Sequence, residues 1–146
     1  MESRFATRPR DISQALLDFN PHLVHFSGHG TETGELCFES SNGNNHFVTP
    51  QALAVLFELV SDRVRCLILN ACYSQIQADE IARHIPFVIG MNDSISDKAA
   101  IAFSVGFYKA IGSGKTIDKA FKFACVELQL ENIPEEHIPI LHQKKL

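Results

Sequence analysis

The sequence lacks the long apolar runs, the excess of basic residues and the paired cysteines that mark several classes of protein. Its apolar runs are far too short to span a bilayer, and the start, Met1-Glu2-Ser3-Arg4, lacks the apolar core of a signal peptide. Lys and Arg number 13 and Asp and Glu number 17, with no basic stripe, so nucleic acid is a poor candidate partner. We therefore expect a cytoplasmic protein that binds neither a membrane nor nucleic acid.

Cysteine occurs four times but never as a Cys-x-x-Cys pair. In a reducing compartment these residues should be free thiols rather than a disulfide framework. Cys66 falls in an apolar run and Cys125 on the apolar stripe of a predicted helix, so we interpret these two and Cys37 as structural.

The sequence does contain enough apolar residues for one core. With 146 residues, of which 45% are hydrophobic, the chain is long enough to form a single domain over residues 1–146. It shows no internal repeat and no low-complexity linker.

Apolar periodicity alternates between helix and strand along the chain. Helices between strands make the strands parallel, so this order predicts an α/β fold with a mostly parallel sheet. Asn42-Gly43 predicts a hairpin, Thr49-Pro50 the start of a helix, and the tail after Ile133 should pack only in part. The predicted strands are 23–27, 64–71 and 87–91, and the predicted helices include 9–19, 75–84, 98–111 and 117–130.

His29 and Cys72 each follow one of the short apolar runs. The carboxyl ends of parallel strands are where open α/β sheets place their sites, so these two side chains can meet there. A cysteine attacks as the thiolate, and a histidine can serve as its base. The alternative is that Cys72 is a buried strand cysteine and His29 an ordinary loop residue.

The residues around this pair are suited to acyl transfer. Ser74 and Gln77 fit a capping box, which would start a helix just after Cys72 and direct its positive end at the thiol. Glycine at Gly30 lets a substrate approach closely, so the amides of Gly30 and Cys72 are the predicted oxyanion donors.

These segments resemble the CHAT branch of the caspase-like cysteine peptidases. The resemblance rests on His25-Phe26-Ser27-Gly28-His29-Gly30 and Leu69-Asn70-Ala71-Cys72-Tyr73-Ser74, and it runs from about Pro9 to Pro139, although the caspase Gln-Ala-Cys signature is absent. It implies a caspase-like three-layer sandwich with helices on both faces. It also implies His29 as general base, Cys72 as nucleophile, and hydrolysis of peptide bonds through an acyl-enzyme.

The resemblance implies a pocket for the substrate as well. In several caspase-like branches an acidic residue in the region of Asp97 receives a basic P1 side chain, and Asp93 is a second candidate. Alternatively, Asp97 or Ser96 simply caps the helix. His25 is interpreted as a supporting residue that hydrogen-bonds near the site.

Two other patterns are weaker. The spacing of His22, His25 and His29 suggests zinc, but no cysteine or acidic residue lies close by in the sequence to complete a ligand set. The segment 112–116 looks like a phosphate loop, but its first glycine would fall at Lys109 and it follows a helix. We therefore expect no metal and no cofactor.

One departure from the family concerns the start of the sheet. Family members usually have a strand and a helix ahead of the segment that aligns with Pro9, and here only residues 1–8 precede it. The shortened sheet should have an unpaired edge. The chain is then either a piece of a larger bacterial protein controlled by a regulatory domain or partner, or it pairs with a second copy. Two functions follow: an active endopeptidase acting on protein or peptide substrates, or a latent module that acts through protein association.

Overall fold

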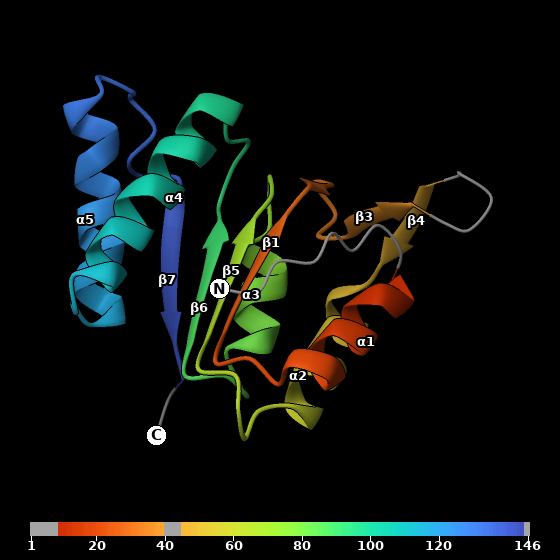
Figure 1. The fold of residues 1–146 in the computed structure, drawn as a ribbon. Coiled ribbons are helices and arrows are strands. Elements are labelled where there is room, and N and C mark those ends of the chain that lie inside the picture. Colours follow the sequence, from red (N-terminus) through yellow and green to blue (C-terminus); the bar gives the residue numbers. More distant parts are fainter. Residues whose placement is uncertain (1–8, 40–44, 145–146) are drawn as a thin grey trace.

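A computed structural model describes residues 9–39 and 45–144 of the chain. Its main sheet has four strands in the order β1, β5, β6, β7 (Figure 1). The first three are parallel to one another, and β7 runs antiparallel beside β6. These strands are β1 (Leu23–Ser27), β5 (Cys66–Asn70), β6 (Phe87–Met91) and β7 (Pro139–Gln143).

A smaller antiparallel sheet projects from the carboxyl end of β1. It has the order β2, β3, β4 and begins at His29 itself. Its strands are β2 (His29–Gly30), β3 (Leu36–Glu39) and β4 (Asn45–Val48). The predicted turn at Asn42-Gly43 lies outside the described residues.

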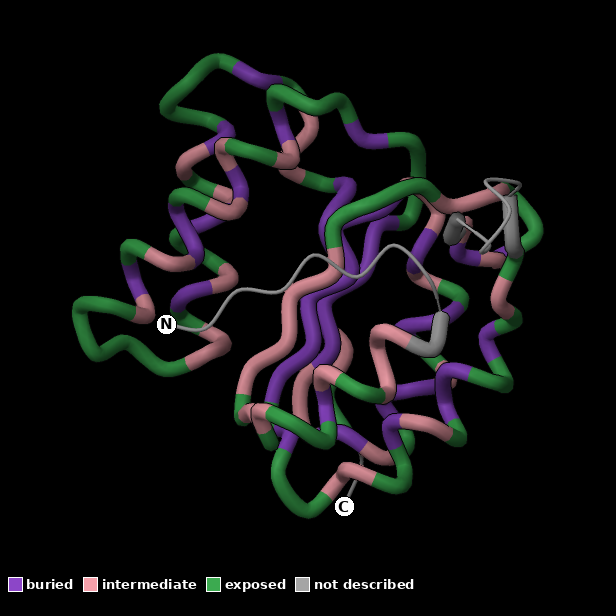
Figure 2. Tube along the Cα trace, turned by 45° about the vertical axis from the view of Figure 1, so that its right-hand side comes forward, coloured by how far each residue is buried: buried purple, intermediate pink, exposed green. Residues whose placement is uncertain are grey.

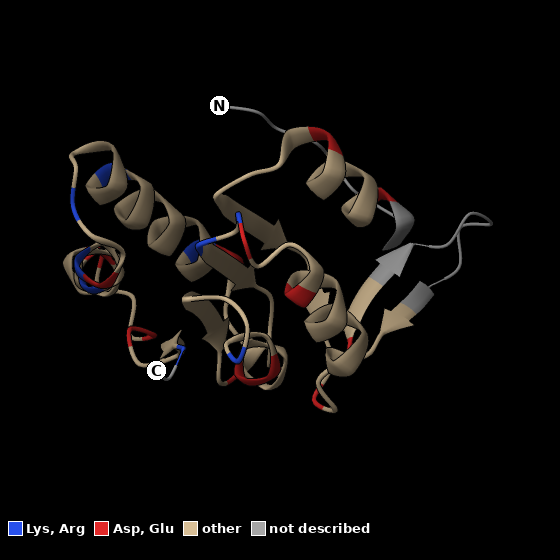
Figure 3. Cartoon of the chain, turned by 90° about the horizontal axis from the view of Figure 1, so that it is seen from below, with Lys and Arg blue, Asp and Glu red and all other residues tan. Residues whose placement is uncertain are grey.

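Five helices are described, and they cover both faces of the main sheet. Seen nearly along the strands, α4 and α5 lie on one side and α1, α2 and α3 on the other (Figure 3). The fold is therefore the predicted α/β three-layer sandwich, consistent with a caspase-like domain. The helices are α1 (Pro9–Phe19), α2 (Pro50–Leu59), α3 (Gln75–Ile81), α4 (Asp97–Gly112) and α5 (Ile117–Leu130).

The core consists of two apolar layers divided by β5. All five residues of β5 are buried, and they appear as a purple strand in the middle of the sheet in Figure 2. Side chains alternate along a strand, so Leu67 and Leu69 pack under α1–α3 while Cys66 and Ile68 pack under α4 and α5. Burial on both faces explains why β5 is an unbroken apolar run in the sequence.

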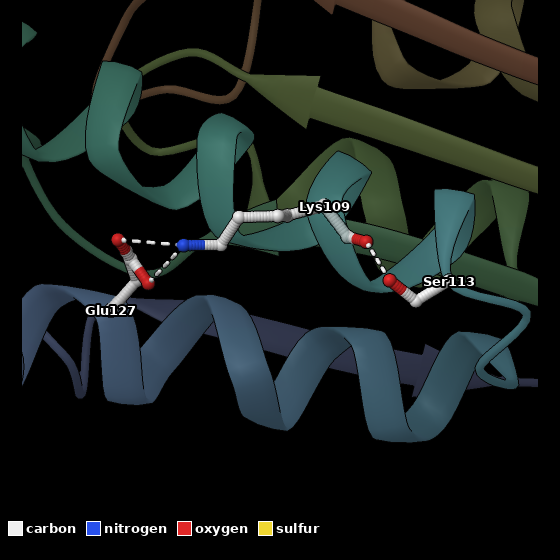
Figure 4. Close-up of polar contacts among 3 residues, drawn as sticks. All are labelled: Lys109, Ser113 and Glu127. Atoms are coloured by element: carbon white, nitrogen blue, oxygen red, sulfur yellow. Dashed lines mark hydrogen bonds and ion pairs between the residues drawn. The ribbon is translucent and has the colours of Figure 1, made fainter.

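Helices α4 and α5 pack closely because Gly106 has no side chain. A Cβ atom there would lie 2.8 Å from Cβ of Glu127. Lys109 on α4 then pairs with the same Glu127, with Nζ 3.3 Å from each carboxylate oxygen (Figure 4). Ser113 Oγ donates to the carbonyl of Lys109 and closes the end of α4.

Two predictions about the elements are corrected. The tail after Ile133 contains a strand that the sequence did not predict, because residues 139–143 form β7 and pair with β6 along its whole length. The helix predicted over 75–84 ends at Ile81, and turns follow it. The strands 23–27 and 87–91 and the helix 117–130 are confirmed with their predicted bounds.

Among the described strands, β1 forms one edge of the main sheet. Beside it, α1, α2 and the sheet enclose an apolar cavity of about 190 Å³. Across the two described ranges, no helix is both long enough and apolar enough to cross a membrane.

Candidate active site

The two predicted reactive residues lie just beyond the last paired residues of adjacent strands. Ser27 on β1 is in register with Asn70 on β5. The N–H of Gly28 still donates to the carbonyl of Asn70, at 3.4 Å. His29 and Cys72 therefore each follow this last pair by two residues, at the carboxyl edge of the sheet.

Gly30 brings the small sheet directly against the turn that carries Cys72. A Cβ atom at Gly30 would lie only 2.1 Å from the carbonyl oxygen of Cys72. No other residue type fits this contact without moving the backbone, so glycine is required here for close approach.

The N–H groups of the two predicted oxyanion donors, Gly30 and Cys72, are not used in the hydrogen bonds of either sheet. His29 is opposite Cys37, and the N–H of Thr31 donates to the carbonyl of Glu35 at 2.9 Å. Because hydrogen-bonded pairs alternate in an antiparallel ladder, the N–H of Gly30 between them points away from β3. For the N–H of Cys72, no acceptor is found among the residues that the structure describes.

The Cys72 thiol lies against the loop between β6 and α4. Its Sγ atom accepts a hydrogen bond from the backbone N–H of Ile95 at 3.4 Å. The thiol also contacts Ser94 Oγ and the carbonyl of Ile95, each at 3.7 Å. The Ile95 N–H is therefore a hydrogen-bond donor to the sulfur, and the Ile95 carbonyl is an acceptor for the thiol proton.

Tyr73 occupies a left-handed conformation, with φ of 58°, directly after Cys72. This conformation costs a non-glycine residue energy, and it is held by a 3.2 Å hydrogen bond from the Tyr73 N–H to the carbonyl of Asp93. The Tyr73 side chain hydrogen-bonds Glu32 in the loop between β2 and β3. Partial burial, together with the nearby Glu32, Asp93 and Cys72, raises the pKa of the Tyr73 hydroxyl.

The predicted capping box after Cys72 is wrong. Ser74 stands at the start of α3 but makes no side-chain cap. Its buried Oγ donates to the carbonyl of Leu69 at 2.8 Å and accepts from the N–H of Met91 at 2.9 Å. The Gln77 side chain donates instead to the carbonyl of Gly34. Ser74 thus joins β5 to β6 beyond Ile68, their last paired position, and fixes the turn behind Cys72.

His29 is exposed, and within the described ranges the structure records no hydrogen bond between its ring and the Cys72 thiol. Its directly opposite residue is Cys37 on β3. Directly opposite side chains lie on the same face of an antiparallel pair. The sequence interpretation took Cys37 as structural and had no signal for this pairing.

His25 is bonded to α4 rather than to His29 or Cys72. Its Nδ1 atom lies 2.8 Å from the hydroxyl of Tyr108, and the two rings stack with centroids 5.7 Å apart. Burial lowers the pKa of His25 and raises the pKa of Tyr108 to about 12. His25 therefore fixes β1 onto α4 next to the candidate site.

The acidic candidates lie on the loop that contacts the sulfur and at the start of the helix that follows it. Ser96 caps α4, since its side chain accepts from the N–H of Ala99 at 3.1 Å. Asp97 is the exposed first residue of the helix and is not needed as the cap. Asp93 bonds the N–H of Ser94 through its carboxylate at 2.7 Å. Glu32 is a further carboxylate, close to Tyr73, that the sequence gave no reason to single out.

These features define a class of protein: a parallel α/β domain with a histidine and a cysteine beyond adjacent strands. The chain belongs to the CHAT domain family, whose model matches residues 1–140. It is similar to a curated "Roc-COR-CHAT protease" from an unknown prokaryotic organism, with 20% identity over 132 residues. That alignment covers 86% of this chain and 12% of the relative, so the chain spans a small part of the relative's length.

Proposed function

We propose that this chain is a cysteine endopeptidase domain in which Cys72 is the nucleophile and His29 the general base. The observation that carries the proposal is the contact of Gly30 with the Cys72 carbonyl, because it holds the strand that begins at His29 against the turn that carries the thiol. The N–H of Ile95 at the sulfur supports an activated thiolate. Membership of the CHAT family and a relative named a protease agree with this chemistry.

The proposed reaction has two steps. His29 takes the thiol proton, the Cys72 sulfur attacks the scissile carbonyl, and the amides of Gly30 and Cys72 stabilise the oxyanion. Protonated His29 then gives its proton to the leaving amine, which leaves an acyl-enzyme thioester. His29 next deprotonates a water molecule that attacks the thioester. The C–S bond then breaks, the acid product is released, and the proton on His29 returns to the Cys72 sulfur. The missing His29–Cys72 hydrogen bond does not oppose this scheme, since such bonds often tighten only when substrate binds.

We propose a basic P1 side chain for the substrate. Asp93 lies on the loop that contacts the sulfur, and Asp97 is free at the exposed start of α4. Two carboxylates near the nucleophile favour Arg or Lys over Glu. Peptides that differ only at P1 test this: we expect cleavage after Arg or Lys, weakened by Asp93→Asn or Asp97→Asn. A preference for Glu at P1 would remove both residues from the pocket.

The peptidase itself is tested by cleavage of such a peptide with the wild-type chain, Cys72→Ala and His29→Ala. We expect loss of cleavage in both variants and retention in Cys37→Ser, whose thiol is opposite His29. Equal cleavage by wild type and Cys72→Ala would exclude Cys72 as the nucleophile.

A second function is favoured by the position of β1 at the edge of the main sheet, as far as the chain is described. Strand β1 is the edge strand, and the apolar cavity lies beside it. Unpaired edges are templates for association, so the alternative is a latent module that binds a second copy or a regulatory partner. The mass in solution tests this, because a strict monomer with full peptidase activity would exclude association as its function.

A further inference from the structure

We infer that Glu135 is a positioning residue for Cys72 and acts on it through the loop of residues 92–96. The inference rests on the proposed role of Cys72 as a nucleophile. Glu135 does not contact the sulfur. It lies in the segment between α5 and β7, more than sixty positions from Cys72 in the sequence.

The loop of residues 92–96 supplies every hydrogen-bond partner that the structure records for the Cys72 sulfur. The central contact is the N–H of Ile95, which donates to Sγ at 3.4 Å. The Ile95 side chain is only 8% exposed and packs in the core under α4. The loop is therefore anchored in its middle, and the direction of the Ile95 N–H depends on how its two ends are held.

Both ends of this loop are held by the segment between α5 and β7. At the first end, the N–H of Asn92 donates to the carbonyl of Ile138 at 3.0 Å, and Nδ2 of Asn92 donates to the carbonyl of His137 at 3.2 Å. At the second end, the contacts are made by a side chain. Ser96 N–H and Ser96 Oγ donate to the two carboxylate oxygens of Glu135, at 2.9 and 2.6 Å.

The carboxylate of Glu135 is well matched to this position. Ser96 Oγ donates to Glu135 while accepting from the N–H of Ala99, so the helix cap and the carboxylate form one chain of hydrogen bonds. A negative charge at the N-terminus of the 16-residue helix α4 is also favourable. Glu135 therefore fixes the Ile95–Ser96 peptide, whose carbonyl lies 3.7 Å from Sγ. Through the Cα atom of Ile95 this also limits how far the Ile95 N–H on the preceding peptide can turn away from the sulfur.

Loss of the carboxylate should loosen Ser96 without unfolding the loop, because Ile95 and the Asn92 contacts remain. The Ile95 N–H would then be directed at Sγ less well. The expected result is a Cys72 that is alkylated more slowly at neutral pH, which is a change in the reactivity of the thiol rather than in its exposure. The titratable side chain that interacts with this thiol is Tyr73, on which Glu32 and Asp93 also act, and a substitution at Glu135 alters none of the three.

The test is the rate of Cys72 alkylation by limiting iodoacetamide in wild type, Glu135→Ala and Glu135→Gln, read by peptide mass mapping. At pH 7 we expect Glu135→Ala to slow Cys72 by about threefold to tenfold, with the gap closing as the pH is raised to 10. Glu135→Gln keeps an acceptor for the Ser96 N–H and should be intermediate. Glu131→Ala, at an exposed residue at the start of the same segment, is the matched control and should leave the rate unchanged.

An unchanged rate in Glu135→Ala, a faster rate, or equal slowing at both pH values would overturn the inference. Thermal unfolding shows which variants fold. If Glu135→Ala does not fold, the alkylation rate of Glu135→Gln decides the question. The proposed function fails separately, if wild-type Cys72 reacts no faster than a cysteine in an unstructured peptide.

Discussion

At Gly30 the absence of a side chain is what lets the small sheet pack on the Cys72 turn. A Cβ atom would meet the Cys72 carbonyl oxygen at 2.1 Å, and that neighbour is backbone, which cannot swing aside. We predict that Gly30→Ala destabilises the fold by roughly 1–3 kcal/mol and abolishes the enhanced alkylation of Cys72. Gly112→Ala is the control, since a Cβ atom there has no neighbour within 4 Å. Unchanged thermal unfolding and unchanged Cys72 alkylation in Gly30→Ala would contradict the packing.

Ser74 provides the second test at this scale. Its hydroxyl is the partner of two buried backbone groups, the Leu69 carbonyl and the Met91 N–H. Ser74→Ala should therefore cost about 1–3 kcal/mol of unfolding free energy. Ser113→Ala removes a similar hydrogen bond, from Oγ to a carbonyl, but at an exposed helix end. It should lower the unfolding free energy by no more than about 0.5 kcal/mol. Equal costs in chemical denaturation would show that Ser74 does not join the strands.

Single residues also show which contacts could not be predicted from the sequence. The spacing of Ser74 and Gln77 fits a cap, but Ser74 instead bonds the two strands beside it, because the ladder between β5 and β6 ends before Met91. Glu32 and Glu135 have no local pattern at all. Their partners, Tyr73 and Ser96, are about forty residues away in the sequence, so only the fold brings them together.

At the scale of elements, the parallel strands of the main sheet were predictable, whereas β2 and β7 were not. β5 and β6 are apolar runs buried on both faces, which leaves a clear signal. β7 is mostly half-buried, and its two apolar residues lie between a proline and a histidine, so no period-2 pattern marked it as a strand. β2 has two residues and depends on pairing with β3 rather than on its own sequence.

The buried contact of His25 on β1 with Tyr108 on α4 predicts how the unfolding free energy depends on pH. Burial lowers the pKa of His25 below its ordinary value of 6.5. As the pH falls below 6.5, the unfolded chain takes up a proton at His25 before the folded chain does, so the folded state loses stability in that window. We expect His25→Phe to reduce the fall in unfolding free energy between pH 7.5 and 5.5. Tyr108→Phe should keep that fall, because the cause is burial rather than the hydrogen bond.

A fall of the same size in wild type and His25→Phe would show that His25 is not the buried group responsible. The comparison uses only the difference between the two pH values. The loss of the Tyr108 partner, which lowers stability at both pH values, therefore does not affect it.

At the scale of the whole molecule, the α/β sandwich follows from the alternation of apolar runs and amphipathic helices. The positions of His29 and Cys72 at one sheet edge follow from the same parallel topology, since both come after adjacent strands. Their relative placement does not follow from it. That placement depends on the small sheet, on Gly30 and on the loop of residues 92–96, which make tertiary contacts between distant segments.

Basic and acidic residues are interspersed over the helices and loops (Figure 3).

The most direct test of the account is the alkylation of Cys72 in the wild-type chain and in His29→Ala at pH 7. An unstructured cysteine peptide is the reference, because Cys37 is opposite His29 and burial raises the pKa of Cys66 to about 12 and of Cys125 to about 11. We predict that Cys72 reacts faster than the peptide and that His29→Ala slows it. If Cys72 reacts no faster than the peptide, or if His29→Ala leaves its rate unchanged, the two residues do not form an activated pair.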